Sequence, residues 1–167
     1  MTKTVIINGT NSDASRVNGI RDYIASKVSN IQTINVYELP AQALITADFN
    51  DEAVKKANKI VEEAAHIIVL TPVYKAAYTG ILKTYLDLLP QKGLENKTIL
   101  PIAVGGSSHH LLAIDYALKP VLGSLGATNI LQGTYILDKY IERKGDGLAI
   151  EQEILDRIDH QLEILEQ

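Results

Sequence analysis

The sequence predicts an α/β protein in which helices cover both faces of a parallel β-sheet. Short β-branched apolar runs recur along the chain without polar alternation, as expected for strands that are buried on both faces. Between them lie stretches whose apolar residues return every three or four positions, which indicates helices. Strands that alternate with helices pair in parallel through crossover connections, so a doubly wound sheet is the expected architecture.

Composition narrows the possible functional classes. The 167 residues suit one domain spanning 1–167, and a hydrophobic share of 46% provides a core. A net charge of −4 without a basic stripe argues against a nucleic-acid partner. The absence of cysteine excludes disulfides, thiolate catalysis and cysteine zinc sites. No apolar run is long enough to cross a membrane and no secretory signal opens the sequence, so we expect a soluble, cytoplasmic protein.

The first half of the chain is expected to form two strands and two helices. The first strand is Val5–Ile7, and the turn dipeptide Asn8-Gly9 ends it. The loop that follows is rich in N-cap residues and leads into a helix. In order, the predicted elements are a strand at 5–7, a helix at 17–28, a strand at 33–39, an irregular connection at 41–50 and a helix at 52–65.

A central stretch then provides the third strand and the connection that follows it. Ile67–Leu70 is β-branched and apolar, which predicts a buried strand. Pro72 biases Thr71 away from helical geometry, so the strand is expected to end there. The connector 71–80 contains small residues and tyrosines. Because ligands of open α/β sheets bind where such connectors leave the strands, this segment is expected to form one wall of a site.

The two helices that follow have unusual features. The helix at 81–89 is apolar around most of its circumference, so it is either deeply buried or part of an oligomer interface; we expect self-association, with Tyr85 in the contact. In a helix at about 109–125, Pro120 cannot donate to the Tyr116 carbonyl, which predicts a kink or a π-bulge, and the residues alone favour the kink. The remaining predicted elements are a strand at 98–104, a strand at 130–137 and a helix at 150–165.

The strand order cannot be obtained from the residues alone. A flavodoxin-like order, 2-1-3-4-5, would place a site at the switch point between the first and third strands. That order brings Thr10–Arg16 next to Thr71–Tyr78, with Gly105–Ser107 as a third wall.

Each of these three walls has a plain alternative explanation. The hydroxyls and Arg16 of the first loop suit a phosphate at a helix N-terminus, but simple helix capping explains them too, and Asp13 opposes an anion. The second loop has flat and aromatic side chains that suit a planar ring or the core. Gly105-Gly106 permits a close approach or merely a tight turn. Their convergence at one sheet edge favours a ligand site. His109 and His110 do not form a metal-ligand pattern.

Two motifs in the second half resemble the signature of the NADPH-dependent FMN reductases of alkanesulfonate-utilisation systems. The first is TPVYKAAYTGILKTYLDLLP at 71–90. The second is LPIAVGG at 100–106, followed by HLLAIDYALKPVL at 110–122. The resemblance implies a flavodoxin-like three-layer α/β/α fold with a five-stranded parallel sheet, bound FMN, NADPH or NADH as reductant, and homo-oligomers, either dimers or tetramers.

The resemblance also implies roles for individual residues. Tyr116, just before Pro120, matches a tyrosine linked in the family to a π-helix at a tetramer interface and to exchangeable FMN, which favours a π-bulge here. The family's first loop usually reads Gly-Ser-Pro-Arg, whereas this chain has Gly9-Thr-Asn-Ser, with one arginine and one hydroxyl fewer and Asp13 added. The implied cofactor-binding residues are Thr10, Ser15 and Arg16 for the phosphate, Thr71, Pro72, Val73, Tyr74 and Tyr78 for the isoalloxazine ring, and Gly105, Gly106 and Ser107 for its pyrimidine end.

The function that follows is hydride transfer from NAD(P)H to flavin N5, which supplies reduced FMN to a partner monooxygenase. The cofactors carry this chemistry, so no side chain is expected to act as an acid or a base. One alternative is a related enzyme that retains FMN and reduces quinones, azo dyes or metal ions. A second is a flavodoxin-like electron carrier without turnover, which the mild negative charge disfavours.

Overall fold

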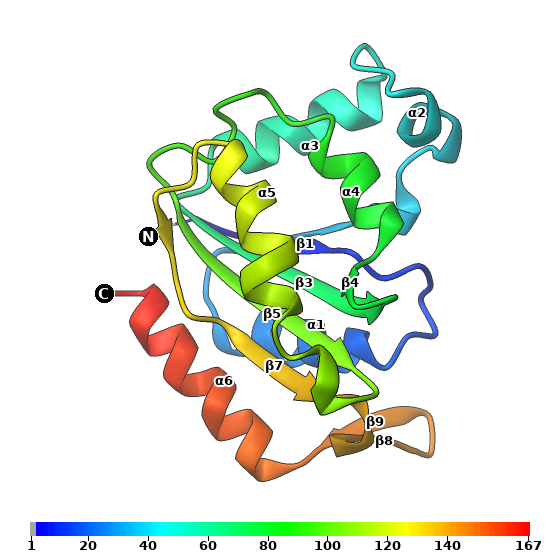
Figure 1. Cartoon of the computed structure of the whole chain (residues 1–167), viewed down its shortest axis with the longest axis vertical. Coiled ribbons are helices and arrows are strands. Elements are labelled where there is room, and N and C mark those ends of the chain that lie inside the picture. The colour runs from blue at the N-terminus through cyan, green and yellow to red at the C-terminus, as the bar shows by residue number, and fades with distance from the viewer. Residues whose placement is uncertain (1–2) are drawn as a thin grey trace.

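A parallel sheet with the strand order β2-β1-β3-β5-β6 forms the centre of the molecule, and helices lie on both of its faces (Figure 1). The computed structural model describes residues 3–167. The strands are β1 (Thr4–Asn8), β2 (Ile31–Asn35), β3 (His66–Tyr74), β4 (Ala77–Tyr78), β5 (Thr98–Gly105), β6 (Asn129–Ile130), β7 (Thr134–Leu137), β8 (Ile141–Lys144) and β9 (Gly147–Ile150). The helices are α1 (Val17–Lys27), α2 (Ala41–Thr46), α3 (Glu52–Glu62), α4 (Gly80–Leu86), a π-helix (Ile114–Leu118), α5 (Lys119–Ser124) and α6 (Gln152–Leu165).

The predicted strand order is confirmed. β1 pairs in parallel with both β2 and β3, and β5 pairs in parallel with β3 on one side and with β6 and β7 on the other. The main sheet has seven strands rather than five, because β4 is a short hairpin partner of β3 and the predicted fifth strand is divided. The switch point therefore lies between β1 and β3, as predicted.

The fifth strand is divided opposite a proline. β6 pairs with β5 at Thr98 and Ile99, and β7 resumes the pairing at Ile102, so the interruption faces Pro101. Proline has no N–H to offer a neighbouring strand. Gly133 fills the interruption with a φ of +82°, and a Cβ there would lie 2.3 Å from the Pro101 carbonyl oxygen. The close approach therefore requires glycine at this position.

The prediction that the third strand ends at Thr71 is wrong. β3 continues through Pro72 to Tyr74 and folds back into β4. Its pairing with β1 stops at Leu70, so Pro72 lies where β3 has become an edge on that side. Proline is tolerated at such an edge, because no strand on that side requires its N–H.

The core lies on both faces of the sheet. On one face, β-strand residues pack against α2, α3, α4 and α5, and on the other they pack against α1 and α6. Neighbouring residues of a strand point to opposite faces, so Ile7 and Val69 belong to the first cluster while Ile6 and Ile68 belong to the second. This arrangement is the predicted three-layer α/β/α architecture.

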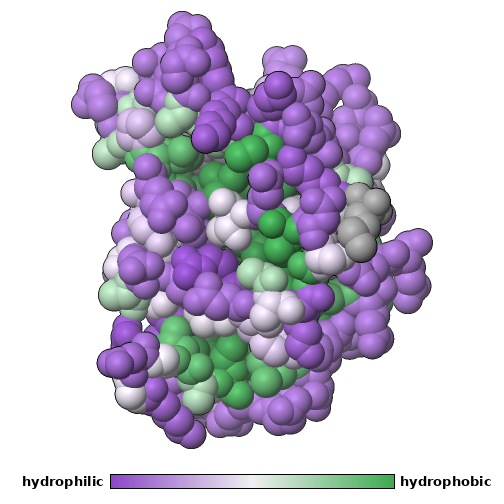
Figure 2. Space-filling model, turned by 180° about the vertical axis from the view of Figure 1, so that it is seen from behind, coloured by the Kyte–Doolittle hydropathy of each residue, from purple (hydrophilic) through white to green (hydrophobic). Residues whose placement is uncertain are grey.

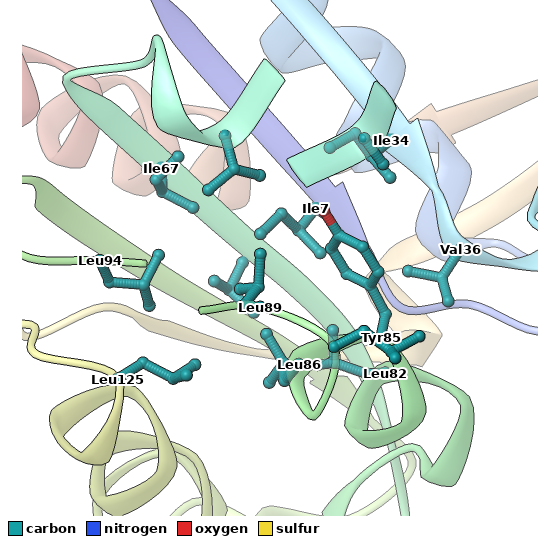
Figure 3. Packing of buried hydrophobic residues seen from close by; sticks show 14 of the residues in the cluster. Ile7, Ile34, Val36, Ile67, Leu82, Tyr85, Leu86, Leu89, Leu94 and Leu125 are labelled. Carbon is teal, nitrogen blue, oxygen red and sulfur yellow. The ribbon is translucent and has the colours of Figure 1, made fainter. Parts of the chain in front are cut away.

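Tyr85 was expected in an oligomer contact, and the structure contradicts this expectation. Its side chain has no exposed surface and points from α4 into the core beside Ile7 and Val36 (Figure 3). Its hydroxyl has no hydrogen-bond partner among the described residues. The apolar circumference of this helix is explained by burial inside one chain, so Tyr85 offers no surface to a second copy.

One helix and one further hairpin were not predicted. The segment expected to be an irregular connection contains the short helix α2, and β8 and β9 form an antiparallel hairpin before α6.

Seen from behind, the surface is mostly hydrophilic, with hydrophobic surface in separate patches (Figure 2). Among the described residues, no helix has the length and apolar character needed to traverse a bilayer.

Candidate functional site

The first two predicted loops are joined at the carboxyl ends of β1 and β3 (Figure 1). The Gly9 amide donates to the Leu70 carbonyl at 2.7 Å, which extends the β1–β3 pairing into the loop. The buried Thr79 hydroxyl donates to the Gly9 carbonyl at 2.5 Å and also caps α4 by accepting from the Leu82 amide. The predicted juxtaposition of Thr10–Arg16 and Thr71–Tyr78 is thus confirmed.

Thr10 and Ser15 shape the first loop from within. The Thr10 side chain is fully buried, and its hydroxyl donates to the Ser12 carbonyl at 3.0 Å and accepts from the Ser12 amide at 3.3 Å. The half-buried Ser15 accepts from the Val17 amide at 3.3 Å, at the start of α1. Thr10 therefore orders the loop rather than presenting a free hydroxyl at its surface.

Arg16 is the cation that the first loop exposes. It occupies the N-cap position of α1 without capping the helix through its side chain, and α1 has no acidic residue in its first turn. Its guanidinium pairs with no other side chain in the part of the chain that the structure describes. Asp13 is turned to the Tyr37 hydroxyl, which donates to it at 3.3 Å. A free arginine beside a helix N-terminus suits an anion.

A buried asparagine cluster below this loop was missed in the sequence. Asn8 and Asn18 are 0% and 3% exposed. The Asn18 amide nitrogen donates to the carbonyls of Ser12 at 3.0 Å and Asp13 at 2.8 Å. Buried amides require partners, so polar residues at strand-end and inner-helix positions were the signal that could have identified the cluster.

The second wall is the β3–β4 hairpin rather than an open loop. Its two-residue turn consists of Lys75 at φ +50° and Ala76 at φ +63°. Two positive φ values are those of a type I′ turn, which usually contains asparagine or glycine, so this turn is strained. Thr71 and Pro72 are buried, Val73 and Tyr78 are half-buried, and Tyr74 is 54% exposed.

Thr71 connects the two ends of this wall. Its hydroxyl donates to the Pro72 carbonyl at 2.7 Å and accepts from the Thr79 amide at 3.2 Å. Val73 pairs with Tyr78 across the hairpin. The wall therefore presents Val73, Tyr74 and Tyr78 from a hydrogen-bonded scaffold.

The third wall contains Tyr135, which was not among the predicted site residues. A Cβ at Gly105 would lie 2.1 Å from the Tyr135 hydroxyl, so the close approach at Gly105 is made by the protein's own side chain. That hydroxyl donates to the Ser107 carbonyl at 2.6 Å. Burial raises the pKa of Tyr135, and the Asp138 carboxylate raises it further, so the hydroxyl keeps its proton. Gly106 is the more open glycine, because a Cβ there would meet only Asp138 Oδ2, at 3.7 Å.

A π-helix borders the site, as the resemblance implied. It spans Ile114–Leu118, and Pro120 lies in the first turn of α5 directly after it. Because Pro120 has no N–H for the Tyr116 carbonyl, the helix changes its hydrogen-bond register here. Tyr116 is 79% exposed and lines a cavity of about 370 Å³ with Ala76 and the two histidines, His109 and His110. Within the described residues, no metal-ligand cluster of histidine and acidic side chains occurs.

Three features lie at this edge of the sheet. They are the exposed Arg16 at the start of α1, a wall of flat and aromatic side chains, and the open position at Gly106. These features suit a ligand that has both a phosphate and a planar ring. The hydrogen bonds of Thr71 and Tyr135 in these walls join hydroxyls to backbone groups and position no acid or base side chain. The site is therefore suited to binding and orienting a cofactor that carries its own chemistry.

Known proteins match the chain along most of its length. An FMN reductase (NADPH) from Pseudomonas putida is 45% identical over 121 residues, which cover 72% of this chain and 61% of that protein's own length. An FMN reductase (NADPH) from Escherichia coli is 39% identical over 143 residues, covering 83% of this chain and 75% of the relative. A crystal structure of the apo form of an NADH:FMN oxidoreductase (EMOB) superposes with a TM-score of 0.85 at 33% identity, covering 99% of this chain and 88% of the other.

The family model described as NADPH-dependent FMN reductase matches residues 2–142. This match includes all three walls of the site, and it confirms the family resemblance seen in the sequence. The names of these relatives describe oxidoreductases that use FMN with NADPH or NADH, and the superposition confirms that this chain shares their flavodoxin-like fold. The chain belongs to the NADPH-dependent FMN reductase family.

Proposed function

We propose that this chain reduces FMN with NAD(P)H at the sheet edge between the 10–16 loop, the β3–β4 hairpin and Gly105–Ser107. The observation that carries the proposal is the exposed guanidinium of Arg16, which lies beside the start of α1 without a side-chain partner among the described residues. A phosphate is the group that this arrangement accepts most readily.

The protein's contribution is to bind and to orient. When bound, FMN supplies the hydride-accepting atom. Arg16 holds the phosphate beside the start of α1, Tyr74 and Val73 lie along the ring, and Gly106 leaves room for the pyrimidine edge. Pairing of Val73 with Tyr78 across the β3–β4 hairpin holds these two residues in place beside the sheet.

The proposal includes self-association through the π-helix. Leu111 and Leu112 are each 52% exposed, and Tyr116 is more exposed still, so the π-helix and the residues before it present apolar surface. The family resemblance supports a second copy as the occupant, and a dimer or a tetramer would cover these side chains. Reduced FMN that leaves the site would serve a flavin-dependent monooxygenase.

The test is NADPH consumption by the purified protein with and without added FMN. Consumption near background without FMN, rising saturably as FMN is added, supports flavin as a substrate. Consumption by yellow protein that is independent of added FMN supports the alternative, a retained cofactor with a quinone, azo dye or metal ion as the acceptor. Background consumption in both cases refutes the proposed activity.

A variant of Arg16 tests the phosphate role separately. Arg16→Ala removes the charge-assisted contact, worth about 1.5–3 kcal/mol, so FMN affinity should fall by roughly 10-fold or more. Riboflavin has no phosphate, and its affinity should stay within about 2-fold. Lys139→Ala, in the segment between β7 and β8, is a control that removes an equal charge outside the three walls. Equal losses for the two flavins would refute the role of Arg16.

A further inference from the structure

We infer that Asn18 is a positioning residue for the flavin phosphate, because it holds the 10–16 loop from below without contacting the reacting atoms. The inference rests on the proposed function, since it concerns the same loop. It follows from a polar cluster in which the buried Asn8 and Asn18 meet the half-buried Asn35 and Arg21, and which the hydride transfer does not otherwise use.

The cluster joins three elements at the carboxyl end of the sheet. The Asn8 amide at the end of β1 donates to Asn18 Oδ1 in α1 and to Asn35 Oδ1 at the end of β2, both at 2.9 Å. Arg21 Nη1 donates to the same two oxygens at 3.2 Å. The Asn18 and Asn35 oxygens thus each accept two hydrogen bonds, which gives a rigid polar platform beneath the loop.

The partners of Asn18 determine how its amide is oriented. Arg21 can only donate, so it must face the Asn18 oxygen, and backbone carbonyls can only accept, so they must face the nitrogen. That nitrogen uses both of its protons, one on the Ser12 carbonyl and one on the Asp13 carbonyl. A single side chain therefore anchors two consecutive peptide groups of the loop.

Anchoring these carbonyls also aims the amides of the loop. In a trans peptide the N–H points away from its carbonyl, so the amides of Asp13 and Ala14 are turned away from the cluster. The Ala14 amide donates to the exposed Ser12 hydroxyl at 3.0 Å. A phosphate oxygen is a stronger acceptor and can replace that hydroxyl. Asn18 thereby presets the amides that an anion requires.

A second anchor acts from the β8–β9 hairpin. The exposed Arg143 guanidinium donates to the Ala14 carbonyl, so three successive carbonyls of the loop are bound by side chains from outside it. The loop lacks the proline of the Gly-Ser-Pro-Arg pattern, and proline would restrain φ from within. The asparagine and arginine anchors supply this restraint through tertiary contacts.

The test uses a near-isosteric pair of variants and measures binding without reductant. Asn18→Asp keeps an oxygen for Asn8 and Arg21 but removes both donors to the loop. Asn35→Asp adds the same negative charge to the same cluster, where the Asn35 oxygen already acts as an acceptor. Flavin fluorescence titration gives the Kd for FMN and for riboflavin, and circular dichroism verifies folding.

Asn18→Asp should weaken FMN binding by about 10-fold, as expected for two lost hydrogen bonds, and riboflavin binding by less than about 2-fold. Asn35→Asp should change both by less than about 3-fold. Equal FMN losses in the two variants would mean that charge, not anchoring, matters and would overturn the inference. An equal loss for FMN and riboflavin in Asn18→Asp would overturn it as well.

Arg143→Ala provides a second test in case Asn18→Asp does not fold, because Arg143 is exposed. It should lower FMN affinity by about 3-fold and leave riboflavin affinity unchanged; unchanged FMN affinity would refute anchoring. An unaltered protein that binds neither flavin would refute the proposed function together with this inference. If the unaltered protein reduces FMN but the variants lose FMN and riboflavin affinity equally, the inference alone is refuted.

Discussion

Removing the hydroxyl of Tyr85 should stabilise the protein. The side chain is fully buried, and its hydroxyl has no hydrogen-bond partner among the described residues (Figure 3). Burial also raises the pKa of this phenol, so the group stays neutral and carries an unsatisfied dipole into the core. Tyr85→Phe deletes this group and keeps the ring.

The magnitude follows from two opposing terms. A buried hydroxyl without a partner costs about 1–3 kcal/mol, and Phe removes this cost. The space left by one oxygen removes dispersion contacts worth a few tenths of a kcal/mol. The net gain in unfolding free energy should be about 1 kcal/mol, which raises Tm by roughly 2–4 °C in a chain of this size.

Urea unfolding followed by circular dichroism measures this change, and Tyr23→Phe is the matched control. The Tyr23 hydroxyl donates to the two carboxylate oxygens of Asp159 at 2.7 and 2.9 Å. The same chemical change there should destabilise the protein by about 0.5–1.5 kcal/mol. A loss of stability in Tyr85→Phe would show that the hydroxyl has a partner and would refute the reasoning.

Three further predictions follow from particular positions. Gly133→Ala places a Cβ against the Pro101 carbonyl at positive φ, so it should lower the free energy of unfolding, measured in urea, by about 2–4 kcal/mol. In the control Gly123→Ala the new Cβ meets nothing within 4 Å, so that variant should be neutral or stabilising. A mild effect at Gly133 would contradict the required close approach. Burial lowers the pKa of His66 in the folded protein, so the stability linked to its neutral form is present above the unfolded pKa of 6.5 and declines as the pH falls through that region. The urea midpoint should therefore drop between about pH 7.5 and 5.5. A drop of equal size in His66→Gln would exclude His66 as its cause. Tyr116→Ala should reduce the mass measured by light scattering or increase the flavin retained on purification, and an unchanged mass and spectrum would count against the π-helix contact.

Local patterns were enough to predict alternating strands and helices, and the flavodoxin-like strand order implied by the family resemblance then predicted the meeting of the first two loops. Continuous apolar, β-branched runs such as Ile67–Leu70 indicate strands buried on both faces, and parallel pairing places the carboxyl ends of β1 and β3 at one edge. Pro120 likewise predicts a defect in the helical hydrogen bonding, and the family resemblance indicated correctly that this defect is a π-helix. Each of these inferences depends on neighbours in sequence or on a motif.

The errors arose where the outcome depends on a distant partner. Pro72 ends a strand only if a neighbour needs its N–H, and β1 had already ended. Tyr85 seemed available to a second copy because sequence does not reveal how many elements surround a helix, and here Ile7 and Val36 reach it from β1 and the turn after β2. The fifth strand is divided where its pairing with β5 is interrupted opposite Pro101, and Gly133, which fills the interruption, is distant from Pro101 in the sequence.

The sequence by itself therefore determined the fold class, the family and the edge where the site forms, because hydrophobic periodicity and local motifs act over a few residues. Only the tertiary structure decided which polar groups meet there. Asn8, Asn18 and Asn35 come from three elements, and their value lies in shared hydrogen bonds at 2.9 Å. Hydrogen bonds require atoms to be within reach and aligned, and the packing of β1, α1 and β2 is what brings these amides together.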